Sequence, residues 1–217
     1  MNKTEIFKSI GVKYETDKVS HHGYHFQYPT FLSEFRDEEF NLLELGYLHG
    51  NSHSMWLEYF PKAKIFSADI CSNPVNENHV VLQCDQSNRE DIKKIANEIK
   101  CAKVIIDDAT HQPSHQAETF HYLFTNLLSY GGVYIIEDVE CNYWNPEIYN
   151  DIYRIGVLNC IDYTKSFIDQ INSEFSGKKN TYQISSITYA QNCIIIKKQT
   201  EEEISFFNRS YRFFNCL

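Results

Sequence analysis

The chain has 217 residues, 29 of them acidic and 20 of them lysine or arginine, which gives a formal net charge of −9. This length is typical of one domain, and a hydrophobic share of 42% supplies enough side chains for a core, so a disordered chain is excluded. The acidic balance argues against nucleic acid or a membrane surface as the partner, because both attract a basic face.

The cysteines and the N-terminal segment predict a soluble, cytoplasmic protein. Seven cysteines are scattered without a CxxC pair, which is typical of reduced thiols rather than of a disulfide framework. The N-terminal segment has no apolar run of the kind that a secretory signal needs. The longest charge-free stretch, residues 119–136, contains polar residues and two glycines, so it is expected to form a helix, a turn and a strand.

Residues 1–40 predict a helix over Asn2–Ile10 and then an aromatic, histidine-rich region that resembles a lid. Its rings either line the mouth of a substrate site or form an exposed loop, and they are His21, His22, Tyr24, His25 and Tyr28. No internal repeat or flexible linker divides the chain. We therefore predict a single domain over residues 1–217, with this N-terminal segment and an α/β core over residues 41–217.

Five short runs rich in Val, Ile or Leu lack polar alternation, as do strands that are buried on both faces of a parallel sheet. They are Asn41–Leu45, Lys64–Asp69, Val80–Gln83, Lys103–Asp107 and Val133–Glu137.

Helical patterns lie between these runs. Asn51–Phe60 is stopped by Pro61, and Ser87 begins a capping-box pattern that leads into a second helix. His115–Tyr130 carries one apolar stripe and is expected to end at Gly131. This alternation predicts a doubly wound α/β sheet.

The C-terminal part has a different character. Residues 147–175 predict one or two helices, and Gly177–Asn180 predicts a turn. Thr181–Tyr189 and Cys193–Lys198 predict two strands joined by the short connection 190–192, and a tight hairpin makes that pair antiparallel. We therefore expect a mostly parallel sheet that ends in an antiparallel hairpin.

A glycine-containing turn follows the first predicted strand. Gly46 and Gly50 come just before a helix, where glycine lets the backbone approach a ligand and the helix offers free N–H groups. The spacing Gly-x3-Gly differs from that of dinucleotide binders, which argues against a nicotinamide-dependent dehydrogenase. A structural turn remains an equally good interpretation of this motif alone.

Carboxylates follow four of the predicted strands. Asp69 closes the second strand, where a carboxylate can bind both hydroxyls of a ribose, and Asp85 after the third would face an adenine amino group. The neighbouring fourth and fifth strands end in acidic pairs that would repel one another unless a cation joined them, and oxygen ligands favour Mg²⁺. The ligand candidates are Asp108, Glu137 and Asp138, although some of these acids would otherwise be helix caps or solvated loop residues.

His111 lies beside this acidic group and is the best candidate for a general base. A zinc site with His115 is disfavoured, because Pro113 prevents one helix from running through both histidines. Tyr143 and Trp144 would either stack on a sugar ring or pack at the start of the next helix.

These motifs together resemble the class I S-adenosylmethionine-dependent methyltransferases, and most of all the sugar O-methyltransferases of the macrocin and mycinamicin type. The resemblance runs from about Thr16 to Trp144 and resumes weakly in the final hairpin. It rests on the segments Thr16-Asp17-Lys18, LLELGYLHGNSHSMWLEYFPKAKIFSADI, CDQS, VIIDDATHQPSHQ and GGVYIIEDVECNYW.

The resemblance implies seven strands, S-adenosylmethionine as the methyl donor, S-adenosylhomocysteine as the product and Mg²⁺ as the metal. It implies that the catalytic residues are His111 and Asp108, that the metal ligands are Asp108, Glu137 and Asp138, and that the substrate contacts are Tyr143 and Trp144. The cofactor contacts that it implies are Asp17, Lys18, Glu44, Gly46, Gly50, Ser52, Asp69, Ile70, Asp85, Gln86, Ser87 and Asp107.

The expected reaction is the Mg²⁺-assisted methylation of a hydroxyl on a sugar or a glycosylated small molecule. Ala109 and Thr110 depart from the family pattern, which has Gly-Ser there, and Ala109 is tolerated unless that backbone needs a positive φ. A catechol-type O-methyltransferase and a non-catalytic S-adenosylmethionine-binding module remain alternatives. The aromatic segments at both chain ends, including Phe206-Phe207 and Phe213-Phe214, fit a homodimer interface and equally a core.

Overall fold

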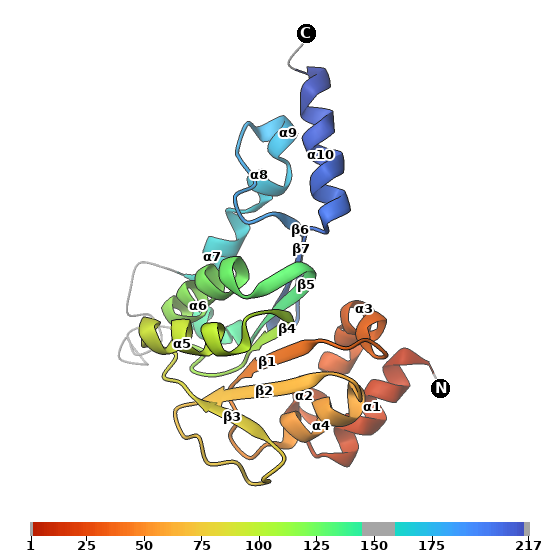
Figure 1. The fold of residues 1–217 in the computed structure, drawn as a ribbon, viewed down its shortest axis with the longest axis vertical. Coiled ribbons are helices and arrows are strands. Elements are labelled where there is room, and N and C mark those ends of the chain that lie inside the picture. Colours follow the sequence, from red (N-terminus) through yellow and green to blue (C-terminus); the bar gives the residue numbers. More distant parts are fainter. Residues whose placement is uncertain (1, 145–158, 215–217) are drawn as a thin grey trace.

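The computed structural model describes residues 2–144 and 159–214, with side chains as far as residue 208 (Figure 1). Part of the helical region that was predicted for residues 147–175 lies outside the described residues, and so do the side chains of Phe213 and Phe214. No described helix has the length and apolar character that a lipid bilayer crossing requires.

Seven strands form one sheet in the order β3-β2-β1-β4-β5-β7-β6. The strands β1 to β5 run parallel, whereas β7 lies antiparallel between β5 and β6. This arrangement confirms the predicted fold class. The strands are β1 (Asn41–Leu45), β2 (Lys64–Asp69), β3 (Val80–Gln83), β4 (Ala102–Asp107), β5 (Leu128–Glu137), β6 (Ile184–Ala190) and β7 (Cys193–Lys198).

Helices cover both faces of the sheet. Successive side chains along each strand point to opposite faces, and those on the two faces belong to two different apolar clusters. Leu43 and Ile105 pack under the helices α5, α6 and α7, whereas Leu42 and Val104 pack under α1, α3 and α4. The α-helices are α1 (Lys3–Lys13), α2 (Asp17–Ser20), α3 (Tyr28–Leu32), α4 (Asn51–Tyr59), α5 (Arg89–Ile99), α6 (Pro113–Asn126), α7 (Cys160–Lys165), α8 (Ile168–Ile171), α9 (Ser173–Ser176) and α10 (Glu201–Phe214). Short 3₁₀ turns are η1 (Tyr24–Phe26), η2 (Ser33–Phe35) and η3 (Val139–Tyr143).

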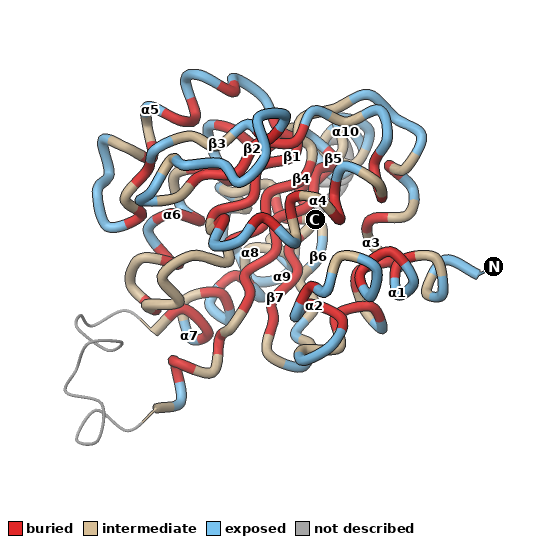
Figure 2. Tube along the Cα trace, turned by 90° about the horizontal axis from the view of Figure 1, so that it is seen from below, coloured by how far each residue is buried: buried red, intermediate tan, exposed pale blue. Residues whose placement is uncertain are grey.

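Burial follows this layering, with buried residues along the central strands and exposed residues on the outer helix faces and loops (Figure 2). Helix α10 projects away from the sheet (Figure 1). The carboxyl ends of β1 and β4 lie side by side where the strand order reverses, which is the usual position of a ligand site in such sheets.

The N-terminal segment packs as part of the core rather than as an open aromatic loop. It forms α1, α2, η1, α3 and η2, and Phe7 contacts the rings of Tyr28 and Trp56 edge-on. Tyr24, His25 and Tyr28 are buried, while His21 stays exposed. Burying a large aromatic ring against an apolar sheet face removes its apolar area from water, which stabilises the fold. This explains why these residues point inward.

Several predicted boundaries are wrong in detail. Helix α6 ends at Asn126 rather than Tyr130, because β5 already begins at Leu128 and contains Gly131 at a positive φ. Helix α5 is capped by Asn88, whose side chain accepts the Glu90 N–H, and not by Ser87. Strand β6 begins at Ile184 rather than Thr181, and α1 continues past Ile10 to Lys13.

Candidate functional site

A cleft of about 560 Å³ opens at the carboxyl ends of β1, β2, β3, β4 and β5. Its walls bring together residues from segments that are far apart in the sequence. Those that the sequence analysis had selected are Asp17, Gly46, Ser52, Asp69, Ile70, Asp85, Gln86, Asp108, His111 and Asp138. The selected residues Lys18, Glu44, Gly50, Ser87, Asp107, Glu137, Tyr143 and Trp144 are not in the cleft wall.

The turn after β1 requires glycine at two positions. Gly46 has a φ of +94°, and a Cβ there would lie 2.1 Å from the carbonyl oxygen of Asp108. Gly50 has a φ of +73° and gives α4 no side-chain cap. The amides of the first turn of α4 therefore lack a capping side chain, which makes this helix start suited to an anionic or polar ligand.

Asp69 is held rigidly at the end of β2. Its Oδ2 accepts the N–H groups of Tyr47 at 2.8 Å and Leu48 at 3.3 Å, and its Oδ1 accepts the N–H of Cys71 at 3.0 Å. These bonds fix a carboxylate in the wall of the cleft, where its remaining lone pairs can accept hydroxyl groups from a ligand.

Asp85 and Gln86 follow β3 on the same side of the cleft. The hydroxyl and the N–H of Ser87 both donate to Asp85 Oδ1, and these hydrogen bonds lower the pKa of the Asp85 carboxyl group. Ser87 therefore orients Asp85, although it does not line the cleft itself. Gln86 donates to Asp107 at 2.7 Å and accepts from the Thr110 side chain at 2.8 Å. This network ties the third strand to the loop that carries His111.

Asp107 lies inside the protein and not in the cleft. It is fully buried, and burial raises its pKa to about 7 although Gln86 and Tyr134 donate to it. Its position indicates a structural role at the end of β4, between the sheet and Gln86.

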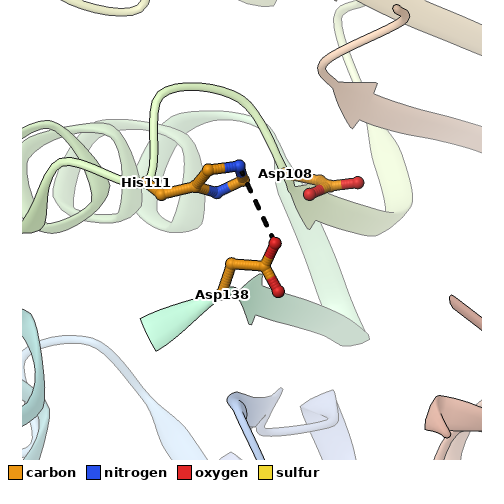
Figure 3. Close-up of side chains that lie close together, drawn as sticks. All are labelled: Asp108, His111 and Asp138. Carbon is orange, nitrogen blue, oxygen red and sulfur yellow. Dashed lines mark ion pairs between the residues drawn. The ribbon is translucent and has the colours of Figure 1, made fainter. Parts of the chain in front are cut away.

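Asp108, His111 and Asp138 come together at the ends of β4 and β5 (Figure 3). One ligand atom from each lies within 4.8 Å of the others, and His111 Nε2 is 3.8 Å from Asp138 Oδ2. Both His111 and Asp138 have a left-handed backbone, with φ values of 55° and 51°. Such strain in residues other than glycine persists only where the surrounding structure imposes it, and it is typical of functional sites.

The electrostatics of this group also depend on burial. Burial and the nearby charge of Asp108 raise the pKa of Asp138. The Nδ1 atom of His111 is buried and has no hydrogen-bond partner among the described residues. A histidine with an unsatisfied ring nitrogen beside two carboxylates can bind a metal ion or take a proton from a substrate.

Lys18 and Glu44 are fully buried behind the cleft. Glu44 accepts from the Trp56 indole N–H at 2.9 Å and from the Ser52 hydroxyl at 2.7 Å. Burial alone would lower the pKa of Lys18, but the carboxylates of Asp108, Glu137 and Glu44 raise it well above its ordinary value, so the lysine is charged.

Glu137 is only 1% exposed, and both of its oxygens have partners. Its Oε2 accepts from Lys18 at 2.8 Å and its Oε1 accepts from the Tyr28 hydroxyl at 2.6 Å. Tyr24 similarly donates to Asp138 Oδ1 at 2.9 Å. From the sequence, these two tyrosines were expected either at a substrate mouth or in an exposed loop, whereas they hydrogen-bond to the acids from inside the protein. No sequence pattern marks a tyrosine for that role.

The remaining selected residues lie outside the cleft. Tyr143 is 74% exposed on η3, and neither it nor Trp144 lines the cleft. Ala109 has no positive φ, so alanine fits the position where the family pattern has glycine. His115 Nδ1 contacts the Thr110 hydroxyl at 3.1 Å instead of joining the acidic group, which supports the argument against zinc.

Comparisons with known proteins find similar methyltransferases. The chain is 31% identical over 153 residues to the L-olivosyl-oleandolide 3-O-methyltransferase of Streptomyces antibioticus, covering 66% of this chain and 39% of that protein. It is 25% identical over 173 residues to the 8-demethyl-8-alpha-L-rhamnosyl tetracenomycin-C 2'-O-methyltransferase of Streptomyces olivaceus, covering 75% and 45%. The chain thus spans less than half the length of these curated relatives. No protein-family model matches it.

The comparison of structures gives the same result. The methyltransferase MycE from mycinamycin biosynthesis, solved with Mg, SAH and mycinamycin VI, superposes with a TM-score of 0.78 at 25% identity. The match covers 91% of this chain and 54% of that one. The chain therefore has the fold of the class I S-adenosylmethionine-dependent methyltransferases, and its sequence resembles the sugar O-methyltransferases of the mycinamicin and macrocin type.

Proposed function

We propose that the chain catalyses the transfer of a methyl group from S-adenosylmethionine to a hydroxyl of a sugar or a glycosylated small molecule. The observation that carries this proposal is that one cleft joins the glycine turn and Asp69 to the group Asp108, His111 and Asp138. A donor site and a deprotonation site in one cavity allow the two reactants to meet in line, and such positioning supplies much of the rate.

The donor side of the cleft fits S-adenosylmethionine. Asp69 would accept the ribose hydroxyls, because its carboxylate is fixed by three backbone N–H groups and lines the cavity. Asp85 and Gln86 would face the adenine, while Ser52 and the start of α4 would face the methionine part. Asp17 and Ile70 border the same space. When bound, the donor supplies a methyl group that is already activated by its sulfonium charge.

The acceptor side fits a divalent metal ion. Asp108 and Asp138 would hold Mg²⁺, since oxygen ligands suit this ion and the two carboxylates converge with His111. Bound Mg²⁺ would lower the pKa of an acceptor hydroxyl. We assign Glu137 to the support of this site, because Lys18 and Tyr28 already occupy its oxygens.

His111 would act as the general base. It lies in the cleft wall, its left-handed backbone fixes it beside Asp138, and its Nε2 lies 3.8 Å from Asp138 Oδ2. The proton of the acceptor hydroxyl would pass to His111, and the oxygen would form a bond to the methyl carbon. The bond between that carbon and the sulfonium sulfur would break at the same time, and S-adenosylhomocysteine would leave. A proton transfer of this kind typically contributes roughly 10²–10⁴ to a rate.

The nature of the acceptor is inferred from the relatives. The matched proteins are named for O-methylation of a rhamnosyl tetracenomycin, of L-olivosyl-oleandolide and of mycinamicin VI. A catechol-type acceptor would offer two neighbouring hydroxyls in a similar arrangement, so it is the main alternative. A non-catalytic S-adenosylmethionine-binding module is disfavoured because Asp108, His111 and Asp138 converge in the cleft.

The test is transfer of a labelled methyl group from S-adenosylmethionine to a panel of methyl rhamnosides, methyl glucosides and catechols in the presence of Mg²⁺. We expect transfer to a sugar and its loss in His111→Ala, while His121→Ala, an exposed histidine on α6, keeps it. Transfer to catechols alone would favour the alternative acceptor. Full activity of His111→Ala would contradict the role of this residue.

A further inference from the structure

Lys18 is a fully buried cation among three carboxylates. Its Nζ lies 2.6 Å from Asp108 Oδ2, 2.8 Å from Glu137 Oε2 and 3.3 Å from Glu44 Oε1. The lysine comes from the short helix α2, whereas the acids lie on or just after the neighbouring strands β1, β4 and β5. An ammonium group has three N–H donors, so these contacts match its capacity.

The charges in this group depend on one another. A buried ammonium without partners would be very costly, and so would buried carboxylates without a cation. The repulsion among these acids was the reason to expect a metal from the sequence, yet Lys18 already supplies a positive charge to Glu44, Glu137 and one oxygen of Asp108. The acid group is therefore held together by the chain itself.

Asp108 belongs to two groups at once. Its Oδ2 accepts from Lys18, and the same carboxylate converges with His111 and Asp138 on the cleft side. The side chain of Asp108 is 23% exposed, whereas those of Glu44 and Glu137 are at most 1% exposed. Lys18 thus lies between an inner pair, Glu44 and Glu137, which is buried against it, and an outer pair, Asp108 and Asp138, which faces the cleft.

We propose that Lys18 is a positioning residue, a built-in counter-cation that keeps Asp108 in place before any metal binds and weakens the binding of a divalent ion at the outer pair. This inference rests on the metal site of the proposed function. An ion bound to Asp108 would share that carboxylate with the ammonium group, and two positive charges on one carboxylate repel. Lys18 would therefore keep the ion exchangeable while the site stays assembled.

The test uses Mn²⁺ alone as the probe, titrated calorimetrically into the full chain. Lys18→Met removes the charge at a similar side-chain length, and Lys13→Met, an exposed lysine on α1 paired with Glu58, is the matched control. We expect Lys18→Met to bind Mn²⁺ about tenfold more tightly than the wild type, and Lys13→Met to bind as the wild type does. We also expect Mn²⁺ to raise the melting temperature of Lys18→Met by more than that of the wild type.

A second pair of variants covers the case in which Lys18→Met does not fold. Glu137→Gln keeps a polar partner for Tyr28, and Lys18→Met in that background removes one positive and one negative charge together. We expect this double variant to fold and to bind Mn²⁺ more tightly than Glu137→Gln. A folded Lys18→Met or double variant that binds Mn²⁺ no more tightly than its parent would overturn the inference.

Titration of S-adenosylhomocysteine into the wild type separates the two claims. Failure to bind it would overturn the proposed methyltransferase function, whereas the Mn²⁺ comparison would still decide the role of Lys18. Absence of Mn²⁺ binding in all of these proteins would overturn the role of Lys18 and leave the donor site intact.

Discussion

Replacing Gly46 by alanine should damage the fold and the site together. The residue joins β1 to the glycine turn at a φ of +94°, and an added Cβ would lie 2.1 Å from the Asp108 carbonyl oxygen and 2.9 Å from its carbonyl carbon. These are backbone atoms of the neighbouring strand end, so no side-chain rotation can relieve the clash. The strands must separate, and Asp108 must move.

The size of the effect follows from two separate contributions. A residue other than glycine at a left-handed φ costs roughly 1–2 kcal/mol. Forcing an extra carbon into a packed site typically costs about 1–3 kcal/mol more. The sum of about 2–5 kcal/mol is a large fraction of the free energy of unfolding of a typical domain, which is about 5–15 kcal/mol.

Gly177→Ala is the matched control for this prediction. Gly177 has a φ of +70°, and a Cβ there would meet no heavy atom within 4 Å, so this variant carries only the backbone strain. Urea unfolding should therefore show a clearly larger loss of stability for Gly46→Ala than for Gly177→Ala. Calorimetry should show that only Gly46→Ala loses binding of S-adenosylhomocysteine. Equal losses of stability in the two variants would refute the steric reasoning.

Three further predictions concern single groups. Burial raises the pKa of Asp107 from its ordinary value of 3.8 to about 7, so between these values the folded protein holds a proton that the unfolded chain releases. The free energy of unfolding should therefore fall by roughly 3 kcal/mol as the pH rises from about 5 to about 8. In urea unfolding of Asp107→Asn, the free energy of unfolding should depend less on pH than in the wild type. An unchanged pH dependence would exclude Asp107 as its source. Asp138→Asn should weaken Mn²⁺ binding by more than about tenfold in calorimetry, while Asp162→Asn, an exposed acid, should not. Trp56→Phe removes the indole donor to buried Glu44 and should lower the free energy of unfolding by roughly 1.5–3 kcal/mol; a smaller loss would mean that water replaces the bond.

The central sheet was predictable because strands that are buried on both faces have short, nearly continuous apolar runs in the sequence. The ranges predicted for β1, β2, β3 and β7 match the observed ones. The end of α6 was misplaced because Leu127 and Leu128 continue its apolar stripe although they belong to a turn and a strand. Periodicity reports which residues are buried but not which element buries them.

Part of the site was likewise predictable from the sequence, and part was not. Asp108, His111 and Asp138 were predicted to be neighbours, since parallel strands deliver their ends to one edge, and the structure places them within 4.8 Å of one another. The partners Lys18 and Tyr28 were missed in this role, because they reach the acids from a segment that is 90 to 119 residues away in the sequence. Only tertiary packing defines such contacts.

The most direct test of the account is a calorimetric titration of S-adenosylmethionine into the wild type and into Asp69→Ala, with Mg²⁺ and with a chelator. We predict saturable binding to the wild type in both conditions, because the donor contacts lie away from the metal ligands, and its loss in Asp69→Ala. Asn41→Ala, at the opposite end of β1, is the control and should bind normally. Absence of binding to folded wild-type protein would contradict the assignment of the cleft as a methyl-donor site.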